Sequence, residues 1–411
     1  MHLYVVTITL LLGLFLGTKS EGNGTALEEA HLAVTKACND FSTALYKAVS
    51  SEPGNVVMSP FSVESVMTLV WMGATGETAN ELSRGLHLPE NRDHVEIGFK
   101  YLLSILESSE TITLDIANKI YLQDGFKLKA PFRRIAVNSF RSDAEEVNFV
   151  NATEEARTSI NKWVEQKTHD KIKDLIAPGS LTVDTRMLAL NAIYFRGGWL
   201  KPFNETDTYF EPFYTSPGKS INVAMMHQTE YFYHGEIPEL QVQVLKLYYR
   251  ATKDDESYED SPKSMLLLIP DAVDGLAALE AKIVHFNVSQ IFNYLSKKEI
   301  ILSLPKFKVG STLKLVDSLK QLGISKVFGR GAELSGITDE PVYITDVVQK
   351  AFIEVTEKGT EAAAATFIEL VNFLGSSPTE LKVNRPFLFL VMDEPSNTVL
   401  FMGRVVHPEI S

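Results

Sequence analysis

The sequence predicts an α+β fold in a single domain. Amphipathic helical patterns dominate the amino-terminal part of the chain, strand-like apolar runs dominate the rest, and no internal repeat or linker divides the 411 residues. The composition is that of a globular protein, with 45% hydrophobic and 22% charged residues. Strands that return from distant parts of the chain are therefore expected to share one core with the helices.

Each expected element follows from its own pattern. Apolar residues at helical spacing predict helices over residues 27–50, 62–72, 78–86, 95–106 and 154–171. Short runs rich in branched and aromatic residues predict strands over residues 188–195, 242–249, 264–269, 300–304, 388–392 and 398–402. The acidic stretch 252–261 is expected to be a solvated loop.

Residues 1–20 predict a secretory signal, with the mature chain beginning near Glu21 and forming one domain over 21–411. The leucine-rich run 10–16 is too short to span a bilayer, and small residues stand where a signal peptidase cuts. A secreted, extracellular protein without a membrane anchor follows from this interpretation. Four Asn-x-Ser/Thr sequons agree with it and are candidate glycosylation sites in exposed loops: Asn23, Asn151, Asn204 and Asn287.

Cys38 is the only cysteine, so no intramolecular disulfide can form. Its apolar neighbours Leu32, Phe41 and Leu45 favour a buried helical cysteine over a reactive or intermolecular thiol. The fold must then be held by its core alone.

Charge and motifs exclude several classes of function. A net charge of -13 argues against nucleic acid as a partner. The sequence contains no Gly-x-Ser-x-Gly elbow, no zinc-protease motif and no nucleotide-binding loop, and we expect no metal, no cofactor and no catalytic residues. A Ser-His-Asp triad assembled from distant residues stays open as a distant alternative. Ser59 and Ser62 are explained more simply as hydroxyls that cap a helix start.

The segment 357–370 carries the main functional signal. Its four consecutive alanines favour a short helix. With a period of two, however, positions 360, 362, 364, 366, 368 and 370 form one uncharged face, while Glu361 and Glu369 fall on the other. Gly359 adds a pivot just before this pattern. A segment that suits both a helix and a half-buried strand is a candidate conformational switch.

This segment resembles the hinge of an inhibitory serpin. Its hinge residues are Glu357, Lys358, Gly359, Thr360, Glu361, Ala362, Ala363, Ala364, Ala365 and Thr366. Six further motifs resemble the family in the family's order, at 55–62 (NVVMSPFS), 190–199 (LNAIYFRGGW), 304–307 (LPKF), 334–337 (LSGI), 384–387 (NRPF) and 400–405 (LFMGRV). The general texture of the chain is similar to that of secreted arthropod serpins.

The resemblance implies the serpin fold, in which helices pack around three β-sheets and a reactive-centre loop, here about 357–380, is exposed near the C-terminus. The region where the main sheet opens would include Ser59, Ser62, Asn191, Trp199 and Gln349. The family's usual histidine is replaced here by Gln349, so this region must differ in its protonation behaviour. We expect a monomer that heparin does not activate, because residues 94–120 hold only Lys100 and Lys119 as basic side chains other than histidine.

Counting along the loop predicts the reactive bond. Phe373 lies sixteen positions past Glu357, the usual spacing in inhibitory serpins, so cleavage is expected between Phe373 and Leu374. The bond after Leu374 or Leu370 is an alternative. An aromatic residue suits chymotrypsin-, cathepsin G- or elastase-like serine proteases, and no lysine or arginine lies between Lys358 and Lys382 to attract a trypsin-like one.

The resemblance predicts a secreted suicide inhibitor of chymotrypsin-like serine proteases. After cleavage, the loop would enter the main sheet and trap the acyl-enzyme; serpin loop insertion is itself a standard example of strand addition and of released strain. The alternative is a non-inhibitory serpin that acts as a carrier, chaperone or storage protein, and a secreted hydrolase is a distant third.

Overall fold

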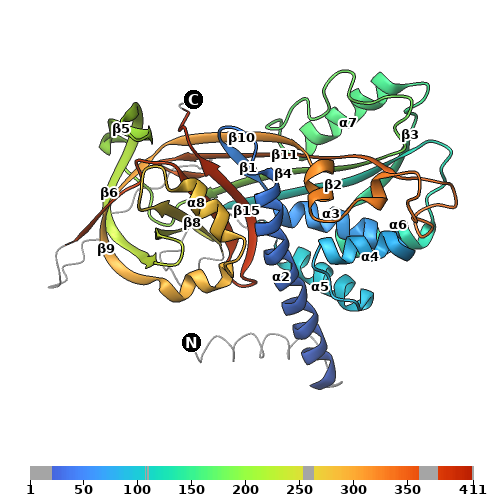
Figure 1. Ribbon diagram of the computed structural model, residues 1–411, viewed down its shortest axis with the longest axis horizontal. Coiled ribbons are helices and arrows are strands. Elements are labelled where there is room, and N and C mark those ends of the chain that lie inside the picture. Colours follow the sequence, from blue (N-terminus) through green and yellow to red (C-terminus); the bar gives the residue numbers. More distant parts are fainter. Residues whose placement is uncertain (1–20, 107, 109–110, 253–262, 361–377, 410–411) are drawn as a thin grey trace.

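The computed structural model describes residues 21–106, 108, 111–252, 263–360 and 378–409 (Figure 1). The expected signal segment, most of the acidic stretch, and the hinge and bait residues 361–377 lie outside this described part. No helix within it combines the length and apolar character that a membrane crossing requires.

The helices gather mainly in the amino-terminal part, as predicted. They are α2 (Glu21–Val49), α3 (Pro60–Gly73), α4 (Gly76–Gly85), α5 (Arg92–Ile105), α6 (Ala130–Phe140), α7 (Thr153–Lys167), α8 (Leu276–Ile283) and α9 (Val316–Gln321), with 3-10 turns η1 (Glu205–Asp207), η3 (Val288–Tyr294) and η4 (Lys326–Phe328). All five predicted helices are present.

A six-stranded sheet forms the middle layer of the molecule. Its order is β10 (Phe307–Lys314), β11 (Ile344–Thr356), β12 (Gly359–Thr360), β4 (Met187–Gly198), β2 (Ile112–Gln123) and β3 (Asp143–Val147). The two-residue β12 separates β11 from β4 at one end only, and elsewhere these two long strands pair directly in parallel. We call the line along which β4 and β11 pair the seam. At one end of the seam, β12 already separates the two strands.

The other sheet has nine strands. It runs β1 (Val56–Met58), β15 (Thr398–Val405), β14 (Phe387–Asp393), β8 (Lys263–Pro270), β7 (Val242–Tyr248), β6 (Lys219–Ile237), β9 (Ser296–Pro305) and β13 (Thr379–Lys382), with β5 (Thr208–Ser216) paired to β6. The expected second and third sheets are thus joined in the described residues. The nineteen-residue β6 causes this, because it pairs with β5 near its start and with β7 near its end.

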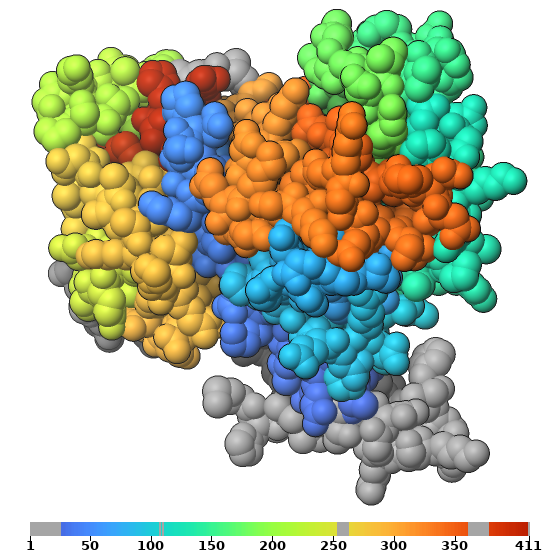
Figure 2. Space-filling model, turned by 45° about the vertical axis from the view of Figure 1, so that its right-hand side comes forward, coloured from blue at the N-terminus to red at the C-terminus, as the bar shows by residue number. Residues whose placement is uncertain are grey.

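Two apolar clusters flank the six-stranded sheet. The main core lies beneath the sheet, and α3 crosses it. Every residue of α3 except Met72 is buried. Ser59 and Pro60 start this helix with a side-chain cap and a preset backbone angle. Above the sheet, α7 covers a smaller cluster, and it stands out as part of the green group at the upper right of Figure 2. A strand that entered the seam would face both clusters.

Cys38 is buried on α2 with Phe41 and Leu45, which confirms that prediction for these three residues. Leu32, predicted to lie with them, is instead 58% exposed. Six residues along a helix turn through about 240°, so Leu32 faces away from Cys38.

Candidate functional site

The start of the hinge is buried, which corrects the expectation that the reactive-centre loop is exposed from about residue 357 onward. The chain turns back after β11, so that Gly359 and Thr360 pair with Thr356 and Val355 on one side. On the other side they pair antiparallel with β4 at Gly198 and Gly197. Gly359 and Thr360 therefore already form a short strand of the sheet, because their small size lets them fit between β11 and β4.

Gly359 is required at this turn. Its φ of 136° lies in a region that side chains disfavour, and a Cβ placed here would lie 2.2 Å from the carbonyl oxygen of Gly197. The predicted pivot is thus also a point where the hinge backbone lies close to β4.

Glu357 fixes the hinge to neighbouring strands. Its carboxylate accepts a hydrogen bond from the Thr208 hydroxyl at 2.9 Å and forms an ion pair with Lys306 at 3.0 Å. Burial alone would raise the pKa of Glu357, but its backbone hydrogen bond, Lys306 and Thr208 together lower that pKa. The carboxylate accordingly stays charged at neutral pH and keeps both contacts. Next to it, Lys358 pairs with Glu205 at 2.9 Å.

Aromatic side chains close the seam behind Thr360. The Thr360 hydroxyl lies 2.8 Å from that of Tyr249, whose ring stacks on Trp199 with centroids 4.7 Å apart. The Trp199 Nε1–H donates to the carbonyl oxygen of Thr356 at 3.0 Å. Trp199, predicted in the sheet-opening region, therefore lies at the hinge end of β4.

The other predicted sheet-opening residues meet further along β4. Gln349 accepts from the Ser59 N–H at 3.0 Å, donates to the Ser59 carbonyl at 2.8 Å and donates to Asn191 Oδ1 at 2.5 Å. Asn191 in turn donates to the Ser62 hydroxyl and, at 2.5 Å, to Asn118 Oδ1. The Ser59 hydroxyl caps α3 by accepting from the Ser62 N–H at 3.3 Å, as predicted. We call these five residues the seam cluster.

Register explains how the seam cluster assembles. Asn118, Asn191 and Gln349 lie directly opposite one another on β2, β4 and β11, and all three are buried. Sequence reasoning missed Asn118 because β2 also contains Asp115, Lys119 and Gln123, so no local pattern distinguishes Asn118 from them. The cluster ties β4 to β11 and both to α3, at the place where an inserting strand would have to pass.

None of the five seam-cluster side chains titrates between pH 5 and 8. A histidine at 349 would become a double donor at acid pH and could no longer accept from Ser59. With glutamine there, the cluster keeps the same hydrogen bonds across this range.

A second restraint crosses the seam above the sheet. The segment after α7 is fixed to β2 by a 2.8 Å contact between His169 and Asp115, and to β11 by a 2.5 Å hydrogen bond from Lys350 Nζ to the Lys173 carbonyl. The His169 ring also lies edge-on to Tyr194 of β4, with centroids 5.9 Å apart. We call residues 168–174 the strap, because they span β2, β4 and β11 in turn.

Comparison with known proteins decides the family. A family model described as "Serpin (serine protease inhibitor)" matches residues 36–408, nearly the whole of the described chain. The chain belongs to the serpin family. This confirms the predicted fold, and it shows that the protein is an inhibitor-family member and not an enzyme, so the hydrolase alternative was wrong.

Similar proteins include a serine protease inhibitor, an insect serpin and a thyroxine-binding globulin. This serpin is 37% identical over 383 residues to Serine protease inhibitor 42Dd of Drosophila melanogaster, which covers 92% of this chain and 98% of the relative. Serpin48 of the insect Tenebrio molitor superposes with a TM-score of 0.82 and 34% identity, over 92% of this chain and 98% of that one. Human thyroxine-binding globulin superposes with a TM-score of 0.82 and 26% identity, over 92% and 100%.

The sequons of this serpin lie at the surface where they are described. Asn151, Asn204 and Asn287 are exposed, and the last two cap η1 and η3. Asn23 falls within α2 instead of a loop, because the helix-forming residues that follow it extend the helix back to Glu21. The predicted reactive bond, Phe373–Leu374, and the hinge residues from Glu361 onward lie outside the described residues.

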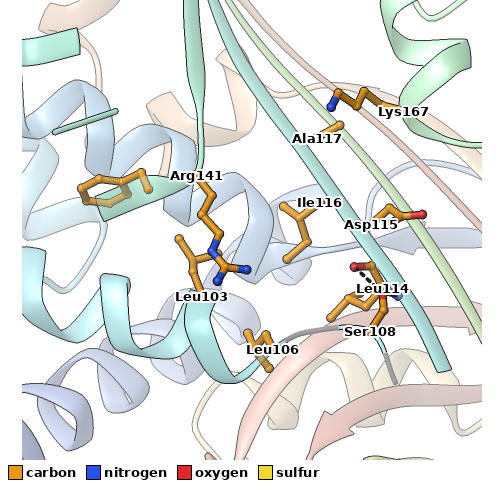
Figure 3. Close-up of a pocket in the computed structure, with 10 residues that line it drawn as sticks. Leu103, Leu106, Ser108, Leu114, Asp115, Ile116, Ala117, Arg141 and Lys167 are labelled. Atoms are coloured by element: carbon orange, nitrogen blue, oxygen red, sulfur yellow. Dashed lines mark hydrogen bonds between the residues drawn. The ribbon is translucent and has the colours of Figure 1, made fainter. Parts of the chain in front are cut away.

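A pocket of about 450 Å³ lies at the outer side of β2, between the ends of α5 and α6 (Figure 3). Its lining combines apolar side chains with polar and charged ones: Leu103, Leu106, Ser108, Leu114, Asp115, Ile116, Ala117, Phe140, Arg141 and Lys167. Asp115 belongs to the anchor of the strap, so this serpin has open space next to the strand that must move if the seam widens. Among the described residues, no group of histidine, cysteine or acidic side chains could hold a metal ion.

Proposed function

We propose that this serpin is a secreted suicide inhibitor of chymotrypsin-like serine proteases, which traps the acyl-enzyme by inserting its cleaved loop between β4 and β11. The observation that supports this most is β12, which already occupies the first positions of such an added strand. Inhibition of serine proteases is the family's general activity; the mechanism, the protease class and secretion are the finer parts of this proposal.

The register of β12 predicts where later hinge residues would go. β12 runs antiparallel to both β4 and β11, so an extension in the same register brings Thr366 opposite Asn191 and Gln349. Paired residues in a sheet share a face, so the Thr366 side chain would point toward Ser59 and Ser62. A hydroxyl arriving there can take over hydrogen bonds that the seam cluster loses when β4 and β11 separate.

The uncharged face of the hinge would enter the main core. Thr360 already lies there, and Ala364 would come opposite Ile193 and Ala351, both of which have no solvent exposure. A buried charge on this face would have to lose its hydration shell, which costs several kcal/mol. This explains why threonine and alanine occupy these positions.

The opposite face of the hinge would enter beneath α7. In the same register Phe367 falls opposite Leu190 and Val348, two members of the apolar cluster under that helix. Glu361 falls opposite Arg196, which is exposed. Both faces of the hinge are therefore complementary to the sheet that would receive them.

Insertion to Leu370 would reach Met187, the first residue of β4. About ten residues would then form roughly twenty hydrogen bonds and break those of eight paired positions between β4 and β11. At about 1 kcal/mol net per hydrogen bond, insertion releases on the order of 10 kcal/mol before side-chain packing is counted. The fourteen residues from Thr360 to Phe373 span some 45 Å when extended at roughly 3.3 Å each, and this is the distance over which a protease bound at Phe373 would be carried.

The protease supplies the catalytic residues for cleavage of the loop. Its serine attacks the carbonyl carbon of Phe373, an ester to the serine oxygen forms, and Leu374 leaves as the new amino terminus. The released hinge is then free to extend β12 into the seam and carry the esterified protease with it. The complex persists if this movement distorts the protease before water hydrolyses the ester.

Incubation with chymotrypsin followed by a denaturing gel tests the proposal. A suicide inhibitor leaves a band at the summed mass of protease and serpin body, together with a released peptide whose mass identifies the bond. Cleavage without such a band for chymotrypsin, cathepsin G and elastase would favour the alternative, a non-inhibitory carrier, chaperone or storage serpin. A carrier is the second candidate function because the chain superposes on a thyroxine-binding globulin.

Secretion, glycosylation and oligomeric state complete the proposal. We propose that the protein is secreted after removal of residues 1–20, that it carries glycans at exposed sequons, and that it acts as a monomer without heparin. Lys119, one of the two lysines in the segment 94–120, is 4% exposed and pairs with Glu145 at 2.5 Å, so it is poorly placed to bind a polyanion.

A further inference from the structure

The edge strand β5 carries an apolar stripe that the core does not use. Phe210 is 67% exposed and Tyr214 39% exposed, and Pro212 between them is also exposed. Since side chains alternate along a strand, these three residues lie on one face of β5. β5 stands at the edge of the molecule, in the yellow-green group at the upper left of Figure 2. Aromatic residues grouped in this way are typical of protein interfaces.

The stripe begins beside Glu357, where the chain turns from β11 into β12. Thr208 is the next residue on the same face, and its hydroxyl donates to Glu357, the first hinge residue. Six residues of strand separate Thr208 from Tyr214, a distance of about 20 Å. The stripe thus runs across the surface from the turn between β11 and β12.

The same strand also borders the other end of the loop. The Tyr214 N–H donates to the Asn384 carbonyl at 2.8 Å, just after β13, the strand to which the loop returns. β13 pairs with β9, β9 with β6 and β6 with β5, so the strand that follows the loop belongs to the same sheet as the stripe. A protein that holds the loop in its active site is consequently brought next to β5.

Pairing with another β-strand does not suit this edge. β5 pairs with β6 on one side, and no described strand pairs with its other side. Pro212 has no N–H to donate, and proline within an edge strand is a common protection against strand pairing. The stripe therefore fits a partner that contacts its side chains and not one that extends the sheet.

We propose that Phe210, Pro212 and Tyr214 form a second docking surface for the target serine protease, which contacts the apolar rim around the protease active-site cleft. This inference rests on the proposed function, because the occupant is the protease that takes the loop. The stripe would increase the affinity of the first, non-covalent encounter and would leave the later insertion step unchanged.

The test separates docking from trapping. Chymotrypsin, cathepsin G and elastase, each with its catalytic serine replaced by alanine, are titrated with the wild-type serpin and with the double variant Phe210→Ala/Tyr214→Ala. We expect the dissociation constant to rise about tenfold or more for at least one of the three proteases. The matched control is Leu32→Ala/Val183→Ala, which removes side chains that are 58% and 56% exposed at other sites and should leave all three dissociation constants unchanged.

Several results would overturn the inference. Equal dissociation constants for the wild type and the stripe variant with all three proteases would show that the stripe is not a docking surface. The inference would also fail if the wild type eluted as a dimer on size exclusion and the stripe variant eluted as a monomer, because another copy of the chain would then occupy the stripe. Active proteases distinguish this from a failure of the proposed function: if the wild type forms a covalent band and the constants are equal, only the docking surface is wrong. If no band forms, both fail.

Discussion

The hydroxyl of Tyr249 lies 2.8 Å from the hydroxyl of Thr360, and neither side chain has any exposure to solvent. Burial raises the pKa of Tyr249 well above its usual range, so this phenol stays protonated and able to donate. The contact shows that the hinge starts inside the protein, held at the open end of a seam. The proposed inhibition requires that the hinge residues after Thr360 follow it into the seam between β4 and β11.

Thr360→Arg should convert the protein from an inhibitor into a substrate. The guanidinium cannot be hydrated where Thr360 lies, so the hinge would leave the seam and insertion would become too slow to trap the protease. We expect the covalent band with chymotrypsin to fall about tenfold or more while cleavage continues. Thr360→Ser, which keeps the hydroxyl, should still form the band, and an undiminished band for Thr360→Arg would contradict the proposed insertion.

Gln349→His should introduce a pH dependence into the seam cluster, which has no titrating group in the wild type. A neutral imidazole can accept from the Ser59 N–H, but a protonated one cannot, so the seam cluster would loosen as pH falls through about 6.5 or below. Burial lowers a histidine pKa and would shift this transition further toward acid. The measurement is the rate at which the uncut protein loses inhibitory activity on warming, from pH 5 to pH 8.

For that measurement we expect the ratio of the variant rate to the wild-type rate to rise from pH 8 to pH 5, because the five wild-type cluster residues carry no group that titrates in this range. A ratio that stays constant over this range would show that residue 349 does not hold the seam closed.

Lys350→Met should release one end of the strap. The lost hydrogen bond to the Lys173 carbonyl involves a charged donor, a contact worth about 1.5–3 kcal/mol. If the strap resists separation of β4 and β11, the uncut variant should lose inhibitory activity on warming roughly tenfold faster. Lys162→Met, which removes an exposed lysine from α7, is the control. Equal rates for Lys350→Met and wild type would mean that the strap is not a barrier.

Phe373→Arg should redirect inhibition toward trypsin. Trypsin's acidic specificity pocket accepts arginine, whereas chymotrypsin's apolar pocket does not. We expect a new covalent band with trypsin and a loss of the band with chymotrypsin. Leu374→Arg and Leu370→Arg serve as comparisons, and chymotrypsin inhibition that is lost only in one of these would move the reactive bond to that residue.

Much of the fold could be predicted from the sequence because its helices and buried strands have clear periodicity. The long β6 was missed because it contributes to two parts of one sheet, and its burial pattern changes along its length. Strand β10 alternates buried and exposed residues, and the second half of β11 alternates buried and half-exposed ones, so both strands could have been found. Leu32 was misplaced because closeness in sequence was taken for a shared helix face.

The site was predicted in its residue types but not in its spatial grouping. Ser59, Ser62, Asn191 and Gln349 do meet, whereas Trp199 lies with Tyr249 at the hinge end of β4. Tyr249 and Thr208 were missed because their roles depend on contacts with residues more than a hundred positions away. The burial of Thr360 depends on a strand order that no local pattern reveals.

The melting temperature of the cleaved protein tests the central claim most directly. The loop is cut within residues 361–377 by a protease that the serpin does not trap, and the cut and intact proteins are compared by differential scanning calorimetry. If the freed hinge fills the seam between β4 and β11, the cut protein should melt at least about 10 °C higher than the intact one. A cut protein that melts at the same temperature or lower would show that the seam does not take up the hinge.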